Sequence, residues 1–148
     1  MAEKNPLDIL RKEHDKVLVL LDRLEKEIEN KADIKKDLIA LEKEFEKHSL
    51  NKEEKVLFPE LEKFMPREGG PTGMMISEHK DLSSSIKNLK DALKQGKERI
   101  EEIGNHIIQL LRQHIDKENN ILFMMADMHL DDKQKKTILE KFKKIDSK

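Results

Sequence analysis

The spacing of apolar residues is the feature of this 148-residue sequence that most restricts its fold. Over most of the chain they recur every three, four or seven positions, which places them on one face of a helix. No segment alternates apolar and polar residues as a half-buried strand does. We therefore predict an all-α fold, specifically an up-down-up-down four-helix bundle with a short fifth helix at the C-terminus.

The first two predicted helices are bounded by recognisable residues. The first begins at Pro6 after Asn5, a favourable N-cap, and ends in the polar stretch before Asp33, where the second begins. The second helix continues past Pro59, which we expect to kink or interrupt it.

A loop over residues 66–73, rich in glycine and proline, divides the chain into two similar parts. The third helix follows it, with Gly96 as the predicted C-cap. The fourth begins near Ile100, and the short fifth runs from Asp131 to about Ile145.

Length and charge narrow the class of protein. We predict a single domain over residues 1–148, with the bundle at about 5–130 and the C-terminal helix at about 131–146. Its 30 basic and 31 acidic residues are interspersed, so no basic face for a nucleic acid is expected. No apolar run could span a membrane and no secretory signal is visible, so we expect a cytoplasmic protein without a membrane partner.

The absence of cysteine excludes thiolate zinc sites, iron–sulfur ligation and thiol nucleophiles. Any bound metal must therefore use histidine and carboxylate ligands. Catalytic triads, phosphate loops and nucleotide-binding motifs are also absent from the sequence, so no catalytic residue is predicted and enzymatic activity is left open.

Each bundle helix has one histidine where the apolar stripe requires a core residue: His14, His48, His79 and His114. A single histidine in such a place is usually a packed, hydrogen-bonded side chain. The two halves of the chain repeat the arrangement, since 39 residues separate His14 from Glu53 and also His79 from Glu118. Burying these imidazoles and carboxylates unpaired would cost about 1 to 3 kcal/mol each, and a metal would satisfy them.

The fourth helix has the simplest ligand pair. Glu118 lies about 40° round the helix from His114, so both can reach one ion. On its own such a glutamate would be interpreted as a solvated charge. With only nitrogen and carboxylate ligands, two of them able to bridge, the set favours a pair of iron or manganese ions over one zinc. It also differs from the Glu-x-x-His pattern of ferritin-like proteins.

In the second helix the predicted histidine and glutamate ligands are one residue further apart than in the fourth helix. Glu53 follows His48 by five residues, which is about 140° on a regular helix and too far for one site. A π-bulge within residues 49–52 would bring them together, and such bulges are frequent at functional sites. Glu54 is the alternative ligand, although the repeat aligns Glu53 with Glu118.

Several nearby residues are given structural roles. Glu13 and Glu78 directly precede predicted ligands, and we expect them to point elsewhere and form solvated salt bridges. His106 is expected to flank the core face or lie at the surface, and His129 is expected to be exposed. The methionines are expected to pack in the core, with Met75 near the open side of the metal site. These methionines are Met74, Met75, Met124, Met125 and Met128.

Over roughly Leu7 to Leu130 the chain resembles the hemerythrin-like domain, also called the HHE cation-binding domain. The resemblance rests on two "EH" pairs, at 13–14 and 78–79, and on two longer motifs, "H…EE..LFP" from His48 and "H..KEN..LF" from His114. It implies a non-haem di-iron centre in the bundle core whose two irons share an oxo or hydroxo bridge, with manganese or zinc as other candidate metals. The implied ligands are His14, His48, His79 and His114, with Glu53 and Glu118 bridging.

Two positions depart from the oxygen-carrying hemerythrins. Those carriers have a fifth histidine where this sequence has Met75, and an aspartate where it has Glu118. The set of four histidines and two glutamates looks more like the family's nitric-oxide-linked iron–sulfur repair proteins and its iron or oxygen sensors. The repair proteins usually have an N-terminal segment with a cysteine, which this sequence lacks.

We therefore predict a di-iron protein that handles or senses O2, NO or peroxide, with any redox partner a separate protein. One alternative is an iron-binding sensor or storage module without turnover, and another is a metal-free helical interaction module. Metal content distinguishes the last from the others. Reactivity of the reduced protein with O2 or NO distinguishes the first two.

Overall fold

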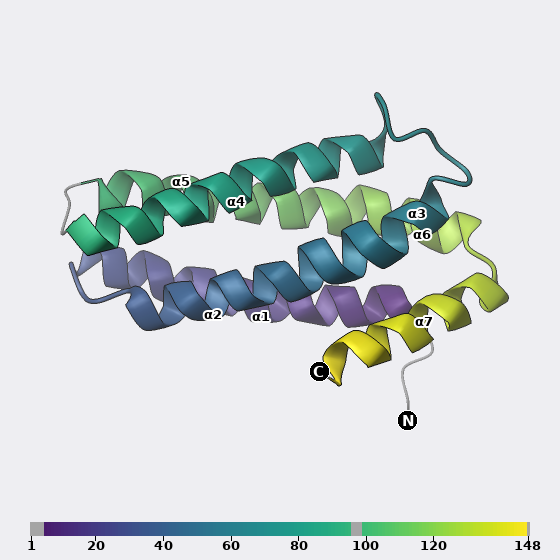
Figure 1. Ribbon diagram of the computed structural model, residues 1–148, viewed down its shortest axis with the longest axis horizontal. Helices are drawn as coiled ribbons and strands as arrows, with labels where there is room; N and C mark the ends of the chain where they lie inside the picture. The colour runs from purple at the N-terminus through teal and green to yellow at the C-terminus, as the bar shows by residue number, and fades with distance from the viewer. Residues whose placement is uncertain (1–4, 96–98, 148) are drawn as a thin grey trace.

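The computed structural model describes residues 5–95 and 99–147, and within these ranges it contains helices and no strand (Figure 1). The predicted all-α fold is therefore confirmed. In chain order the elements are α1 (Pro6–Glu29), α2 (Lys35–Phe45), η1 (Glu46–Leu57), α3 (Phe58–Leu61), α4 (Pro71–Gln95), α5 (Ile100–Lys117), η2 (Glu118–Leu122), α6 (Phe123–His129) and α7 (Asp132–Asp146). The two η elements are π-helices.

The long helices lie side by side as a bundle (Figure 1). Helix α1 packs against α2 and α5, and α4 packs against α5 and α2. The backbone stays helical where α2 meets η1 and η1 meets α3, and likewise from α5 through η2 to α6. The short helix α7 packs against η1 and α1. The chain is thus a helical bundle with an additional C-terminal helix, as predicted.

The predicted starts of the first and last helices are confirmed to within one residue by their N-caps. The side chain of Asn5 accepts a hydrogen bond from the backbone N–H of Leu7 at 3.0 Å, and Pro6 occupies the first turn, where its missing N–H costs nothing. Asp131 and Gln134 form a reciprocal capping box at the start of α7.

Two other boundaries differ from the prediction, and a third lies outside the described residues. Helix α4 begins at Pro71, inside the stretch predicted as a loop, because a proline is well suited to a first helical turn. Pro59 lies in the first turn of α3, so the helix continues through it and ends at Leu61. The C-cap predicted at Gly96 lies outside the described residues.

The π-bulge predicted within residues 49–52 is present in a longer form. The π-helix η1 extends over 12 residues, Glu46–Leu57. A second π-helix, η2, covers Glu118–Leu122 and was not predicted, because the spacing from His114 to Glu118 is that of an ordinary helix.

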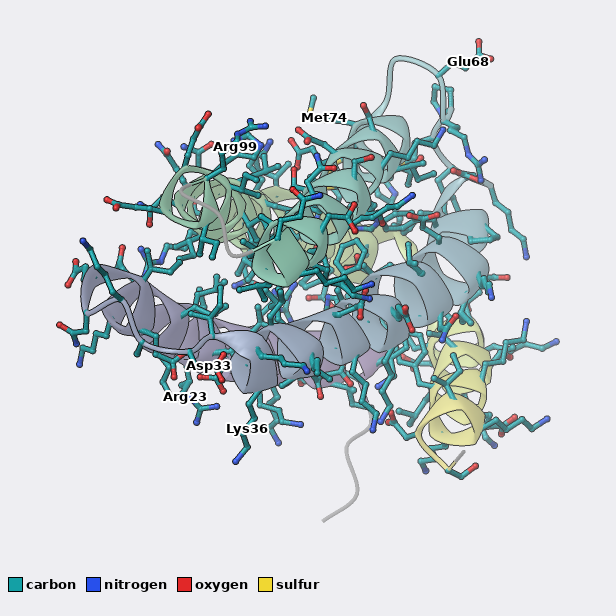
Figure 2. The ribbon with its side chains drawn as sticks, turned by 60° about the vertical axis from the view of Figure 1, so that its left-hand side comes forward. Arg23, Asp33, Lys36, Glu68, Met74 and Arg99 are labelled. Atoms are coloured by element: carbon teal, nitrogen blue, oxygen red, sulfur yellow. The ribbon has the colours of Figure 1, made fainter. Side chains whose placement is uncertain are left out.

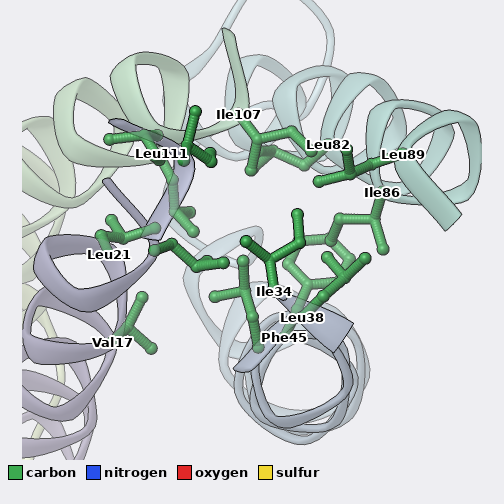
Figure 3. Close-up of a cluster of buried hydrophobic side chains, with 14 of the residues drawn as sticks. Val17, Leu21, Ile34, Leu38, Phe45, Leu82, Ile86, Leu89, Ile107 and Leu111 are labelled. Carbon is green, nitrogen blue, oxygen red and sulfur yellow. The ribbon is translucent and has the colours of Figure 1, made fainter. Parts of the chain in front are cut away.

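Two apolar clusters fill the interior, and a polar layer lies between them. Figure 3 shows the first cluster, in which side chains such as Leu21, Leu38, Leu89 and Leu111 point toward one another from α1, α2, α4 and α5. The second cluster lies around α3, α6 and α7 and includes Leu10. Because the histidine at position 14 follows Leu10 and precedes Val17 of the first cluster, it lies at the boundary between the two.

Charged side chains such as Arg23, Asp33 and Lys36 point outward from the bundle (Figure 2). No helix in the described part of the chain has the length and apolar character needed to cross a membrane.

The prediction that the methionines pack in the core is wrong for three of them. Met75 is buried in the second apolar cluster, and Met125 packs against it. Met74, Met124 and Met128 are 55%, 56% and 78% exposed. Each of these three lies beside the apolar stripe of its helix and therefore faces outward.

Candidate metal centre

The six residues predicted as metal ligands lie together in the polar layer between the two apolar clusters. They come from α1, η1, α4, α5 and η2. Each of the four helical segments of the bundle therefore contributes at least one residue to the layer. All are buried: His14, His48, Glu53, His79, His114 and Glu118.

These six residues form two groups that share both glutamates. His14 and His48 belong to the first group, His79 and His114 to the second, and Glu53 and Glu118 to both. Within each group, one ligand atom of every residue lies within 4.8 Å of the others. We call the two groups the first position and the second position.

In the first position each imidazole faces a different glutamate. The Nε2 atom of His14 lies 2.9 Å from Oε1 of Glu118. The Nε2 atom of His48 lies 3.3 Å from Oε2 of Glu53 and 3.9 Å from Glu118. The same nitrogen of both rings therefore points to the middle of the layer.

The second position repeats this arrangement. The Nε2 atom of His79 lies 3.2 Å from Oε1 of Glu53, and that of His114 lies 3.4 Å from Oε2 of Glu118. The two Nε2 atoms are 3.2 Å apart. Each glutamate thus directs one carboxylate oxygen toward each position, which is the arrangement that a bridging ligand requires.

The other ring nitrogen, Nδ1, of each of the four histidines lies on the outer side of the layer and has a hydrogen-bond partner. Glu13 Oε1 lies 2.9 Å from Nδ1 of His48, and Glu78 Oε1 lies 2.6 Å from Nδ1 of His114. The prediction that Glu13 and Glu78 are merely solvated salt-bridge residues is therefore wrong. Consecutive helical residues point about 100° apart, so Glu13 is turned away from His14 and toward the neighbouring helix.

The other two outer nitrogens have acceptors from the π-helices. Glu54 Oε2 lies 2.6 Å from Nδ1 of His79, and Asn119 Oδ1 lies 2.8 Å from Nδ1 of His14. Glu54, the alternative to Glu53 as a ligand, therefore contacts the outer side of a histidine and belongs to neither group. When Nδ1–H donates outward, the lone pair of Nε2 is left to face the centre.

Two lysines complete the outer contacts. Lys52 pairs with Glu13, and Lys117 pairs with Glu78. Lys52 is completely buried because α7 covers it, and its Nζ also lies 2.7 Å from Asp146. Among the described residues no helix covers Lys117 in this way, and its side chain is 36% exposed.

Without a bound metal, the electrostatics favour the charged form of three of the four histidines and the ionised form of Glu118. Burial opposes the charge on His114, but the carboxylates of Glu118 and Glu78 outweigh it and raise its pKa to about 10. The same balance raises the pKa of His48 and His79. Burial opposes the ionised form of Glu118, yet the neighbouring histidines hold its pKa well below the usual range.

The donor atoms fit a metal cation. Buried atoms without a hydrogen-bond partner include Nε2 of His48, both carboxylate oxygens of Glu53 and Oε2 of Glu118. Native proteins rarely leave such atoms unpaired, since each costs about 1 to 3 kcal/mol. All of them face the layer between the two positions, and imidazole nitrogen with carboxylate oxygen is a donor set that iron, manganese and zinc accept.

Comparison with protein families agrees with this geometry. A family model of the hemerythrin HHE cation-binding domain matches residues 5–126. The chain belongs to this hemerythrin family. The resemblance stated from the motifs is therefore confirmed. Membership indicates metal binding, and the two groups of buried histidines and glutamates could hold a metal ion. No curated protein and no solved structure matched the chain.

Aromatic rings cover the hemerythrin-family site in a repeated way. Phe123 stacks on His14 with ring centroids 5.4 Å apart, and Phe58 stacks on His79 at 6.0 Å. Sequence reasoning assigned no role to either phenylalanine. Both follow a leucine at matching places in the two long motifs, and this repeat was the signal that could have identified them.

The two remaining histidines lie outside the site, as predicted. His106 is exposed on α5, with Nε2 3.7 Å from Asp81. His129 is exposed at the end of α6, where its ring stacks on Phe64. These two residues provide natural controls for substitutions within the site.

Proposed function

We propose that the protein is a non-haem di-iron protein of the hemerythrin family, built on an up-down-up-down four-helix bundle, that handles or senses a small ligand. The ligand is O2, NO or peroxide. Manganese or zinc is the alternative metal. The proposed iron ligands are His14, His48, His79 and His114, with Glu53 and Glu118 bridging.

One observation supports the proposal above all others. The two candidate positions share Glu53 and Glu118, and each carboxylate directs one oxygen to each position. Two separate single-metal sites would have no need of shared carboxylates. Iron bound there would be redox-active and would offer an open coordination position to a small ligand.

The residues around the site support a ligand of diatomic size. A cavity of about 20 Å³ adjoins His14, His48 and His114. One water needs roughly 10 to 15 Å³, so the cavity admits only a very small molecule. Apolar side chains form much of its wall: Val17, Leu41, Phe45, Leu111 and Ile115.

The alternatives differ in how well they account for the buried layer. A metal-free interaction module gives no reason for a completely buried Glu53 that forms no hydrogen bond, although the Nε2 atoms of His48 and His79 lie 3.3 and 3.2 Å from its oxygens. An iron-binding sensor or storage module without turnover would use the same ligands, and reactivity must distinguish it. The cytoplasmic location and the separate redox partner stay predictions.

The test is metal analysis of protein expressed with ample iron, followed by anaerobic reduction and exposure to O2 or to NO. We expect two irons per chain and a visible absorption band that changes on exposure. Glu53→Ala and Glu118→Ala should each lower iron content and weaken the band. His106→Ala and His129→Ala are the controls and should leave both unchanged, because these histidines are exposed.

Absence of bound metal would reject the proposal in favour of the metal-free module. Two irons whose absorption ignores both O2 and NO would instead support storage or iron sensing.

A further inference from the structure

The two cation positions differ in one hydrogen-bond acceptor. Glu54 and Asn119 are 65 residues apart and occupy matching places in the repeat, one residue after Glu53 and Glu118. Each reaches across the bundle to the other half. The carboxylate of Glu54 therefore supports a ligand of the second position, while the neutral amide of Asn119 supports a ligand of the first.

The remaining outer contacts use the same residue types in both positions, although Lys52 is completely buried and Lys117 is 36% exposed. Glu13 and Glu78 each accept from a ligand histidine and each pair with a lysine. A stacked phenylalanine covers one histidine in each position. Glu53 and Glu118 belong to both groups and cannot favour either. The difference between Glu54 and Asn119 is thus not offset by another ligand contact.

Other nearby charges do not cancel this difference. Arg67 interacts electrostatically with Glu54. Its guanidinium is exposed, however, and donates its hydrogen bonds to Glu62. Asp146 adds a negative charge near Lys52, but it also pairs with Lys47 and contacts no ligand histidine in the described structure.

We propose that the two positions bind metal unequally and that Glu54 makes the second position, at His79 and His114, the tighter one. A charged acceptor holds the outer N–H more strongly than an amide does. The carboxylate of Glu54 lies 2.6 Å from Nδ1 of His79, and the amide oxygen of Asn119 lies 2.8 Å from Nδ1 of His14. The charged acceptor therefore strengthens the imidazole as a metal ligand and adds one negative charge to that side. Such outer partners change metal affinity by about 10- to 100-fold.

This inference rests on the proposed paired site. Its test cannot rely on stepwise affinities alone, since repulsion between two close cations separates them even in a symmetric site. The decisive quantity is which position fills first. Crystals of metal-free protein loaded anaerobically with one equivalent of Fe²⁺ would show this by anomalous scattering, and competition with a chromophoric chelator would give the affinity of the first ion.

We expect the first Fe²⁺ at His79 and His114. Glu54→Gln should lower the affinity of the first ion about 10- to 100-fold, whereas Asn119→Asp should raise affinity at the first position. The double variant E54Q/N119D retains the total charge and should send the first ion to His14 and His48. A merely structural role for either residue would not reverse the order of filling.

Equal occupancy of the two positions at one equivalent, or the same order of filling in wild type and double variant, would overturn the inference while leaving the paired site intact. Failure to bind a second Fe²⁺ at saturation would overturn the paired site itself and the inference with it.

Discussion

The two halves of the bundle contain the same ligands but surround them differently. Residues 53–57 of η1 correspond to η2, 65 residues later, so a π-helical turn that includes the shared glutamate is common to both. Residues 46–52 of η1 have no π-helical counterpart, and the extra residue between His48 and Glu53 lies there. The wider helix absorbs the insertion, and both ligands still face the same layer.

The cover of the two halves also differs. Helix α7 packs on η1 and α1, where Phe142 and Asp146 enclose Lys52. The corresponding Lys117 in the second half remains partly exposed. The layer of histidines and glutamates is therefore nearly symmetric, whereas the side chains that surround it differ between the two halves.

The largest predicted effect is on the pH dependence of stability, and it tests Glu118, which belongs to both candidate metal positions. The pKa of His114 is raised in the folded protein from 6.5 to about 10. Its contribution to stability is therefore complete below about pH 6.5 and is lost as pH rises toward 10. For metal-free protein, the free energy of unfolding should fall by about 1.4 kcal/mol per pH unit for each histidine protonated only in the fold.

Urea unfolding of chelator-treated protein between pH 6 and 9 measures this slope. Glu118→Gln should flatten it, because Glu118 is the main carboxylate opposing the burial of His114. His106→Ala should leave the slope unchanged. A wild-type profile that is flat over this range would contradict the prediction.

The next largest effect concerns the helix that covers only the first half. Phe142 is completely buried on α7, and Phe142→Ala should lower the free energy of unfolding by about 3 to 5 kcal/mol. Phe64→Ala is the matched control, since Phe64 is 48% exposed and its truncation should cost about 0.5 kcal/mol or less. Thermal and urea unfolding measure both. Equal losses for the two variants would mean that α7 adds no real core.

The ligand layer could be predicted from the sequence because two independent patterns identify it. His14 and His79 occupy core positions in apolar stripes, and their spacing to Glu53 and Glu118 repeats. Helical periodicity alone would not have separated these histidines from packed core residues. The repeat made the difference, since chance does not place the same polar residues in two cores.

The outer acceptors could not be predicted in the same way. Glu13 holds His48, which lies 35 residues away, and that contact depends on how two helices face each other. Periodicity describes one helix at a time, and it correctly turned Glu13 away from His14. The matching pairs Glu13–Lys52 and Glu78–Lys117 were nevertheless visible as a second repeat, and they were a signal of shared function.

A third prediction compares the two lysines directly. Lys52→Met should lower the free energy of unfolding by about 3 kcal/mol, because Glu13 loses a buried partner. Lys117→Met should cost less than about 1 kcal/mol, because its pair with Glu78 is screened by water. Denaturant unfolding of metal-free protein measures both. A cost at Lys117 equal to that at Lys52 would remove the distinction between the covered and the open half.

The smallest effect is expected from removing the extra residue of the first half. Deletion of Asn51 would place Glu53 four residues after His48, the spacing found between His114 and Glu118. If residues 46–52 are π-helical only to absorb this residue, the shortened helix keeps both ligands in the layer. Metal content should then stay at the wild-type level, and stability should change by about 1 kcal/mol or less. Deletion of exposed Gln113 is the control, because α5 is an ordinary α-helix at that point and the deletion must rotate part of its core face outward by about 100°. Loss of metal in the Asn51 deletion would show instead that the π-helical turns themselves set the geometry of the first position, so that the longer π-helix is a requirement of the site and not a tolerated insertion.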